Sequence, residues 1–182
     1  MNMKTADALL TLVVIPLFHG LVHEAAPVAG LNPYPAQSVT APRSTAAREY
    51  LLSHNQARAA VGVGPLKWSE MLANATSRLV RYQRNKKNCQ FAKLGGNKFG
   101  GNQLWASGAR EPSAVVNYWA QDKEFYDYVS NSCAPNHDCG EYTQVVWRKS
   151  LELGCAQAVC DKSSLSICFY NPPGNYNGER PY

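Results

Sequence analysis

Apolar residues in the first half of the chain recur with the spacing of an α-helix. One such segment covers residues 46–58, and its apolar face is formed by Tyr50, Leu51, His54, Ala57 and Val61. Ser44 or Thr45 can cap the start of this helix, and Gly62 and Gly64 lie where it ends. The pattern therefore predicts a helix that buries one side.

Two further helices are predicted downstream. Ser69, with Glu70 in the first turn, is a suitable N-cap for a helix with an apolar stripe of Leu72, Thr76, Leu79 and Val80. Pro112 begins another helix, with an apolar face that continues through Val115, Val116, Trp119 and Tyr126. Between the two lies LGGNKFGGNQLWASG, residues 94–108, where the glycines predict a loop.

The period of the pattern changes to two after Asn131. Three alternating segments predict β-strands, at residues 142–147, 153–160 and 165–170. Because helices come first and an antiparallel sheet follows, the sequence predicts an α+β domain built in layers.

Glu141 stands at the head of the first predicted strand, in the stretch CGEYTQVVW. Along an alternating strand, Thr143, Val145 and Trp147 would share its face. Charged residues are rarely buried without a partner. Glu141 is therefore either a solvated strand end or part of a functional site.

The N-terminus has the features of a secretory signal. Lys4 precedes an apolar run at residues 8–18, which is too short to span a bilayer. We assign residues 1–25 to the signal peptide, with cleavage between Gly20 and Gly30. Residues 26–45 then form a proline-rich extended linker, and residues 46–182 form one domain, in keeping with 45% apolar and 17% charged residues.

All six cysteines lie in the second half of the chain: Cys89, Cys133, Cys139, Cys155, Cys160 and Cys168. An even number behind a signal peptide predicts three disulfides and not a metal site, and spacing alone leaves the connectivity open. The net charge of +5 favours anionic polysaccharide or lipid headgroups over nucleic acid as partners of a secreted protein.

Several motifs have a structural as well as a functional interpretation. The glycine-rich stretch lacks phosphate-loop spacing, and neither a serine nucleophile elbow nor a free cysteine is expected. A basic ridge is either a solvated helix face or a contact for pectin or anionic lipid; it consists of Arg78, Arg81, Arg84, Lys86 and Lys87. Asn74 begins a glycosylation sequon, although the sequon lies within a predicted helix.

Five groups of residues resemble the CAP superfamily, and more narrowly the plant pathogenesis-related class 1 proteins. They are Ser53-His54-Asn55-x-x-Arg58, Val61 to Leu66 with Trp68, Gly140 to Trp147, Leu153-Gly-Cys155, and Cys168 to Asn175 with the terminal Arg180-Pro-Tyr182. The match runs from about Arg48 to Tyr182. The segment 102–107, with altered cleft positions, is similar to a divergent branch associated with pistil tissue.

The resemblance implies a three-layer α/β/α sandwich with a central antiparallel sheet and three disulfides. By matching position the pairs are Cys89–Cys160, Cys133–Cys139 and Cys155–Cys168. The first closes the longest loop and would contribute about 4 kcal/mol in the chain-entropy estimate.

The resemblance also implies a central cleft that usually presents two histidines and two glutamates. In this chain the four positions hold Lys93, Gly101, Asp122 and Glu141. Zinc prefers nitrogen or sulfur donors and a lysine ammonium has no lone pair, so we expect no metal and no cofactor.

We predict instead an ion-paired cluster of Lys93, Asp122 and Glu141 that stays charged across neutral pH. In the alternative interpretation, the carboxylates of Asp122 and Glu141 perform acid–base catalysis or bind calcium. Calcium, however, takes about six to eight oxygen donors. His137 is the remaining histidine of this region, and we expect it to be exposed.

By resemblance, the protein is a secreted, non-catalytic, defence-related protein of the plant apoplast or cell wall that acts by binding. We expect its partner to be a sterol, another lipid or a cell-wall polyanion. We also expect that the chain does not span a membrane and that the protein is a monomer. A metal-dependent hydrolase is a weaker alternative.

A further alternative is a precursor that releases residues 172–182 as a signalling peptide. Phe169 departs from the family's cleavage segment, and the other interpretation is a tail anchored on the domain by Asn175 and Tyr182.

Overall fold

The structure, a computed structural model, describes residues 44–94 and 98–182. All of them belong to the second of two units into which the chain divides, Val39–Tyr182. The assigned signal peptide, residues 1–25, and nearly all of the linker assigned to residues 26–45 lie outside the described residues.

The two predicted N-terminal helices are present. α1 covers Thr45–Ala59, and the Ser44 hydroxyl oxygen accepts a hydrogen bond of 3.1 Å from the Ala47 N–H, which confirms the predicted cap. α2 covers Glu70–Lys87 and buries Leu72, Thr76, Val80 and Gln83. It ends at Asn88, whose left-handed conformation closes the last turn.

A mixed four-stranded sheet forms the centre of the domain, in the order β1-β5-β6-β2. β5 (Glu152–Cys160) and β6 (Ser163–Asn171) confirm two predicted strands and pair antiparallel. β2 (Gly100–Ser107) pairs antiparallel with β6, whereas the short β1 (Lys67–Trp68) pairs parallel with β5. The sheet is therefore antiparallel except for β1.

The remaining elements lie between β2 and β5 in the sequence. α3 covers Pro112–Ala120, and the 3-10 helix η1 covers Gln121–Glu124. β3 (Tyr126–Asp127) and β4 (Ser132–Cys133) form a small hairpin, and α4 covers Gly140–Val145.

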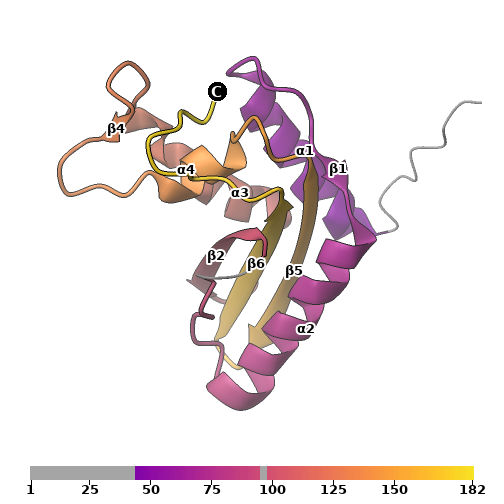
Figure 1. Ribbon diagram of the computed structural model, residues 1–182. Helices are drawn as coiled ribbons and strands as arrows, with labels where there is room; N and C mark the ends of the chain where they lie inside the picture. The colour runs from indigo at the N-terminus through magenta and orange to yellow at the C-terminus, as the bar shows by residue number, and fades with distance from the viewer. Residues whose placement is uncertain (1–43, 95–97) are drawn as a thin grey trace, which may run out of the picture. The chain divides into compact units, whose positions relative to one another are not determined.

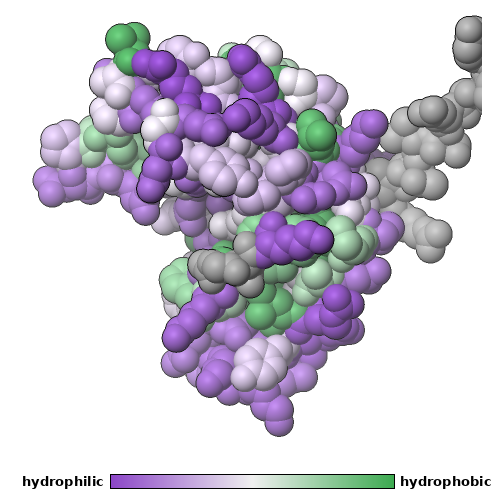
Figure 2. All heavy atoms as spheres, in the orientation of Figure 1, coloured by the Kyte–Doolittle hydropathy of each residue, from purple (hydrophilic) through white to green (hydrophobic). Residues whose placement is uncertain are grey.

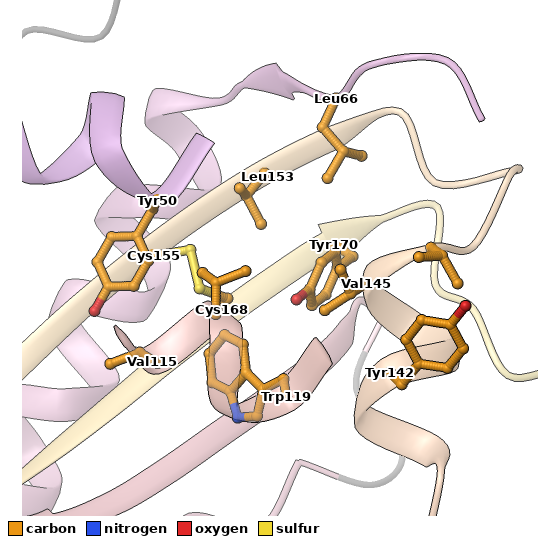
Figure 3. Close-up of a cluster of buried hydrophobic side chains, with 12 residues drawn as sticks. Tyr50, Leu66, Val115, Trp119, Tyr142, Val145, Leu153, Cys155, Cys168 and Tyr170 are labelled. Carbon is orange, nitrogen blue, oxygen red and sulfur yellow. A yellow bond between two sulfur atoms is a disulfide. The ribbon is translucent and has the colours of Figure 1, made fainter. Parts of the chain in front are cut away.

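Helices lie on both faces of the sheet. α2 packs along β5 and β6, where its apolar side chains meet Leu165, Ile167 and Phe169 (Figure 1). Side chains of α1, α3 and α4 meet those of β5 and β6 around the Cys155–Cys168 disulfide on the other face (Figure 3). In Figure 2, hydrophobic side chains gather between α2 and β2, while most of the surface in view is hydrophilic.

Three predicted elements are corrected by the structure. Residues 142–147 are not a strand, because Gly140–Val145 form α4. The predicted loop at 94–108 contains the eight-residue strand β2. The third helix ends at Ala120, and Tyr126 lies in β3.

Both missed elements have a physical reason. α4 is shorter than two turns, and nearly all the side chains from Tyr142 to Trp147 are buried, so its sequence carries no 3.6-residue period. In β2, Gly101 lies against Phe169 and Leu94, so the glycine marks close packing and not a turn.

The three disulfides join Cys89 to Cys160, Cys133 to Cys139 and Cys155 to Cys168, which is the pairing implied by the resemblance. Within the described ranges, no helix is long and apolar enough to cross a membrane.

Candidate functional site

Glu141 lies in the first turn of α4, and the local sequence fixes its position. The Cys133–Cys139 disulfide holds the residue before the helix, and an Asp138 carboxylate oxygen accepts a hydrogen bond of 2.9 Å from the Gly140 N–H. The Cys139 Sγ atom lies 3.7 Å from the backbone oxygen of Asp122. The start of α4 is thereby joined to η1, which carries Asp122.

A buried hydrogen-bond chain connects this helix to β2, β6 and α1. The Asn102 side-chain amide donates to the Glu141 backbone oxygen at 2.9 Å and lies 3.3 Å from the Tyr170 hydroxyl. The His54 Nδ1 atom lies 2.7 Å from the Tyr50 carbonyl oxygen, so Nδ1 carries the proton. The neutral Nε2 atom then accepts from the Tyr170 hydroxyl at 2.8 Å.

Burial determines the protonation of His54. It lowers the pKa of the fully buried imidazole to about 4, with a further lowering by the positive charge of Arg58. His54 is neutral at neutral pH and holds the Tyr170 hydroxyl, which also accepts from the Asn102 amide.

Two other carboxylates, Asp122 and Asp138, lie near enough to Glu141 to act on its charge. Its burial, followed by the negative charges of Asp122 and Asp138, raises the pKa of Glu141 to about 7. Burial also raises the pKa of Asp122, Asp138 raises it further, and His137 acts in the opposite direction. These groups form an acidic cluster, Asp122, Asp138 and Glu141.

The predicted ion-paired cluster is wrong. Lys93 is exposed, and the ion pair found in the described part of the chain joins Lys149 to Glu179 at 2.7 Å. Without a cation beside it, Glu141 titrates near neutral pH instead of remaining charged. The expectation for His137 is confirmed, because its ring is exposed and stacks on Phe125 at 3.5 Å between centroids.

The residues of the cleft do not fit a zinc ion. Glu141 and Asp122 supply only oxygen atoms, whereas zinc sites in proteins rely on imidazole or thiolate. Gly101 has no side chain to supply a ligand, and a Cβ atom there would lie 3.1 Å from Leu94 Cδ1 and 3.3 Å from Phe169 Cδ1, so these hydrophobic side chains would have to shift to admit one. In residues 44–94 and 98–182, no three His, Cys, Asp or Glu side chains form a group that could hold a metal.

The cluster can hold a proton at neutral pH, since a Glu141 carboxyl with a pKa of about 7 exists in both forms. A protonated carboxyl donates a hydrogen bond, and an ionised one accepts. Sequence reasoning missed Asp138 and Asn102. A helix predicted to begin at Gly140 would have placed Asp138 just before the first turn, which carries Glu141, whereas nothing in the sequence indicated the role of Asn102.

The C-terminal segment runs beside α4 (Figure 1). The Asn175 amide donates to the Gly140 oxygen at 2.8 Å and its carbonyl oxygen accepts from Thr143 at 2.8 Å. Tyr182 stacks on Tyr128, with ring centroids 4.8 Å apart, and its hydroxyl lies 3.2 Å from that of Tyr142. Asn175 and Tyr182 therefore anchor the tail, as one interpretation of the sequence predicted.

A small hollow of about 180 Å³ lies between α1 and α3. Its lining is largely apolar, with Ala57, Ala60, Val61, Ala120 and Tyr142, and carries Ser53, Gln56, Asn117 and Lys123 as polar residues.

α2 presents the basic ridge and the sequon. All five basic residues of the ridge are exposed, in keeping with a solvated helix face. Asn74 is also exposed, but Thr76 of the same sequon is buried, with its hydroxyl donating to the Leu72 oxygen at 3.0 Å.

Known proteins share this fold and much of this sequence. The model of the cysteine-rich secretory protein family, CAP, matches residues 51–170. The STS14 protein of Solanum tuberosum is 58% identical over 142 residues, which cover 76% of this chain and 66% of that protein. Pathogenesis-related protein 1 of Arabidopsis thaliana is 45% identical over 136 residues, covering 74% of this chain and 81% of that protein. Among solved structures, venom allergen-like protein 4 of Schistosoma mansoni matches with a TM-score of 0.60 and 27% identity, over 76% of this chain and 94% of that one.

Proposed function

The chain belongs to the cysteine-rich secretory protein (CAP) family, and from this we propose that it is a secreted, defence-related plant protein that acts by binding and not by catalysis. Its similarity to pathogenesis-related protein 1 supports the defence role. Three disulfides and the absence of free cysteines among the described residues suit the oxidising extracellular space.

One observation carries the non-catalytic part of the proposal: none of the four positions Lys93, Gly101, Asp122 and Glu141 holds an imidazole. His137, which acts on Asp122, is exposed and stacks on Phe125. Asp122 and Glu141 supply only oxygen donors, and Gly101 has no side chain to add a ligand. A zinc-bound water, which would supply a nucleophile at neutral pH, has no set of ligands here.

Zinc titration by calorimetry tests this point. We expect no tight zinc binding by the purified, oxidised protein. Glu141→His should not restore tight binding either, because it adds only one nitrogen donor. Tight zinc binding by the unmodified protein would contradict the proposal.

For the ligand, we propose a sterol or another lipid that inserts part of its apolar body between α1 and α3. The hollow of about 180 Å³ is smaller than the ~300–1,000 Å³ of most small-molecule pockets, so only part of such a ligand would be enclosed. Its alanine-rich wall offers no charged group except Lys123.

Two matched variants test this ligand site. Ala60 is exposed and lines the hollow, whereas the neighbouring exposed Ala59 does not. Ala60→Trp should reduce binding of a labelled sterol and Ala59→Trp should not. Equal binding by both variants, or no sterol binding by the wild type, would contradict this site.

Release of residues 172–182 as a peptide is the alternative function. The bond to be cleaved follows Asn171, whose side chain donates to Glu152 at 2.7 Å and whose backbone oxygen accepts from Leu151 at 2.9 Å. A protease needs an extended, accessible segment, so these contacts and the tail anchors oppose cleavage of the folded protein. Detection of the 172–182 fragment in extracellular fluid by mass spectrometry would favour the alternative.

A further inference from the structure

A second hollow, of about 400 Å³, lies between α3 and the edge of the sheet. It is lined by Leu104, Trp105, Ala106, Ser107, Arg110, Ala114 and Tyr118. The first four belong to β2, the last strand in the order of the sheet, and the last two belong to α3. We call this hollow the β2–α3 groove.

Backbone groups of β2 face the groove. The Gln103 carbonyl oxygen accepts a hydrogen bond of 3.4 Å from the indole N–H of Trp119 in α3, so Gln103 directs its backbone away from β6. The Gly108 N–H points in the opposite direction and donates to the backbone carbonyl oxygen of Lys162, in the β5–β6 turn. Because backbone directions alternate along an antiparallel strand, Trp105 and Ser107 also present their N–H and C=O groups to the free edge.

Two aromatic rings of the groove are accessible to solvent. Trp105 and Tyr118 are each 48% exposed, and both line the groove. An aromatic face carries partial negative charge, so it attracts the weakly positive C–H bonds on the flat side of a pyranose ring.

Arg110 is the charged residue of the groove. No ion pair of Arg110 is found in the described part of the chain, where Lys149 and Glu179 form the salt bridge. A guanidinium offers a planar pair of N–H donors that fits a carboxylate.

We propose that the β2–α3 groove binds a polysaccharide that contains uronic acid residues. Trp105 and Tyr118 contact the sugar faces, Arg110 binds the uronate carboxylate, and the free backbone groups of β2 bind hydroxyls. This inference rests on the proposed binding function and names a cell-wall class of partner for it.

An extended peptide that adds a strand to β2 fits the groove less well. Strand addition requires a run of free edge groups, and α3 already occupies the Gln103 oxygen. Beyond that point only Trp105 and Ser107 remain before the strand ends.

The test uses the full, oxidised protein and polygalacturonate, with its methyl ester and a neutral glucan as comparison polymers. We expect polygalacturonate to bind and both other polymers to bind at least about tenfold more weakly. Arg110→Gln and Trp105→Ala should each weaken polygalacturonate binding by about tenfold, and Arg110→Gln should abolish the preference over the methyl ester.

Matched controls lie on α2, away from the groove. Tyr82 is 52% exposed and Arg84 belongs to the basic ridge. Tyr82→Ala and Arg84→Gln should leave the affinity within about twofold of the wild type. Thermal unfolding of every variant checks that the fold is retained, and Arg110→Gln carries the test if Trp105→Ala does not fold.

Three results would overturn the proposal. Loss of binding in Arg84→Gln but not in Arg110→Gln would place the polyanion on the basic ridge. Binding of extended peptides that depends on Trp105, without uronate binding, would make the groove a strand-addition site. Failure of the wild type to bind polygalacturonate would reject the groove while leaving the proposed function to its own sterol measurement.

Discussion

Gly154 shows how closely α2 lies on the sheet. A Cβ atom at this position of β5 would lie 2.2 Å from the Ala73 nitrogen and 2.5 Å from the Leu72 carbonyl carbon, which are backbone atoms of the helix. Gly154→Ala should therefore push α2 off the sheet and lower the free energy of unfolding by about 1–3 kcal/mol or more. Gly64→Ala is the control, because a Cβ there meets nothing within 4 Å. Urea unfolding of both variants measures the difference, and equal stability would contradict this account of the packing.

At the scale of residues, the sequence indicated which positions mattered but not how they interact. The altered identities at positions 93, 101, 122 and 141 were readable from the chain. The charges around Glu141 could not be predicted. Lys93 lies on an exposed loop, and Asp138 comes close to Glu141 only because α4 begins directly after it. Whether two charged side chains meet depends on the direction in which each leaves its backbone, and a misassigned element reverses that direction.

At the scale of elements, Arg58 joins α1 to the segment that follows α4. Its buried guanidinium donates to the carbonyl oxygens of Gly64, Val145, Trp147 and Ser150, at 2.8 to 3.2 Å. Burial lowers the pKa of Arg58 to about 10, so it remains charged at neutral pH. A lysine ammonium cannot reproduce this planar fork of donors.

Arg58→Lys should accordingly lower the free energy of unfolding by about 2–4 kcal/mol, because buried carbonyl groups lose their donors. Arg148→Lys changes an exposed side chain on the same segment and should stay within about 0.5 kcal/mol of the wild type. Chemical denaturation compares the two. A tolerated Arg58→Lys would mean that water replaces the missing donors.

The disulfides should stabilise the domain unequally. Cys89–Cys160 spans 71 residues and Cys133–Cys139 spans 6. In the chain-entropy estimate, removal of the long bridge by Cys89→Ala with Cys160→Ala costs about 4 kcal/mol, and removal of the short one costs about 2 kcal/mol. Thermal unfolding of the two double variants checks the order, and a larger loss for the short bridge would show that its local hold on α4 dominates.

Elements could be predicted where one face is buried and the other is solvated. α1 and α2 have this pattern and were found from it. β5 and β6 were found from the alternation of their sequences, although β6 is buried along nearly its whole length. α4 and β2 lack it: α4 is covered on nearly all sides, and β2 begins with glycines selected by close packing. Their conformation is set by tertiary contacts, which a local pattern does not contain.

At the scale of the whole molecule, the buried His54 and the partly buried Glu141 act on stability in opposite directions. Burial lowers the pKa of His54 from 6.5 to about 4, so the folded protein binds fewer protons than the unfolded chain. The stability that His54 contributes is present above pH 6.5 and is lost as the pH falls through 4. Burial with Asp122 and Asp138 raises the pKa of Glu141 from 4.5 to about 7. Its contribution is present below pH 4.5 and is lost as the pH rises through 7.

Between pH 4.5 and 6.5 these two contributions offset each other, so replacement of Glu141 should expose the effect of His54. Relative to the wild type, we expect Glu141→Gln to gain about 1–2 kcal/mol between pH 4.5 and 7, a value reduced from the full shift because Glu141 is only partly buried. Its own stability should then fall more steeply than that of the wild type as the pH is lowered. Glu124→Gln, at an exposed carboxylate of η1, should run parallel to the wild type. Urea unfolding across this pH range gives the curves, and parallel curves for Glu141→Gln and the wild type would mean that solvent reaches Glu141 and screens the acidic cluster.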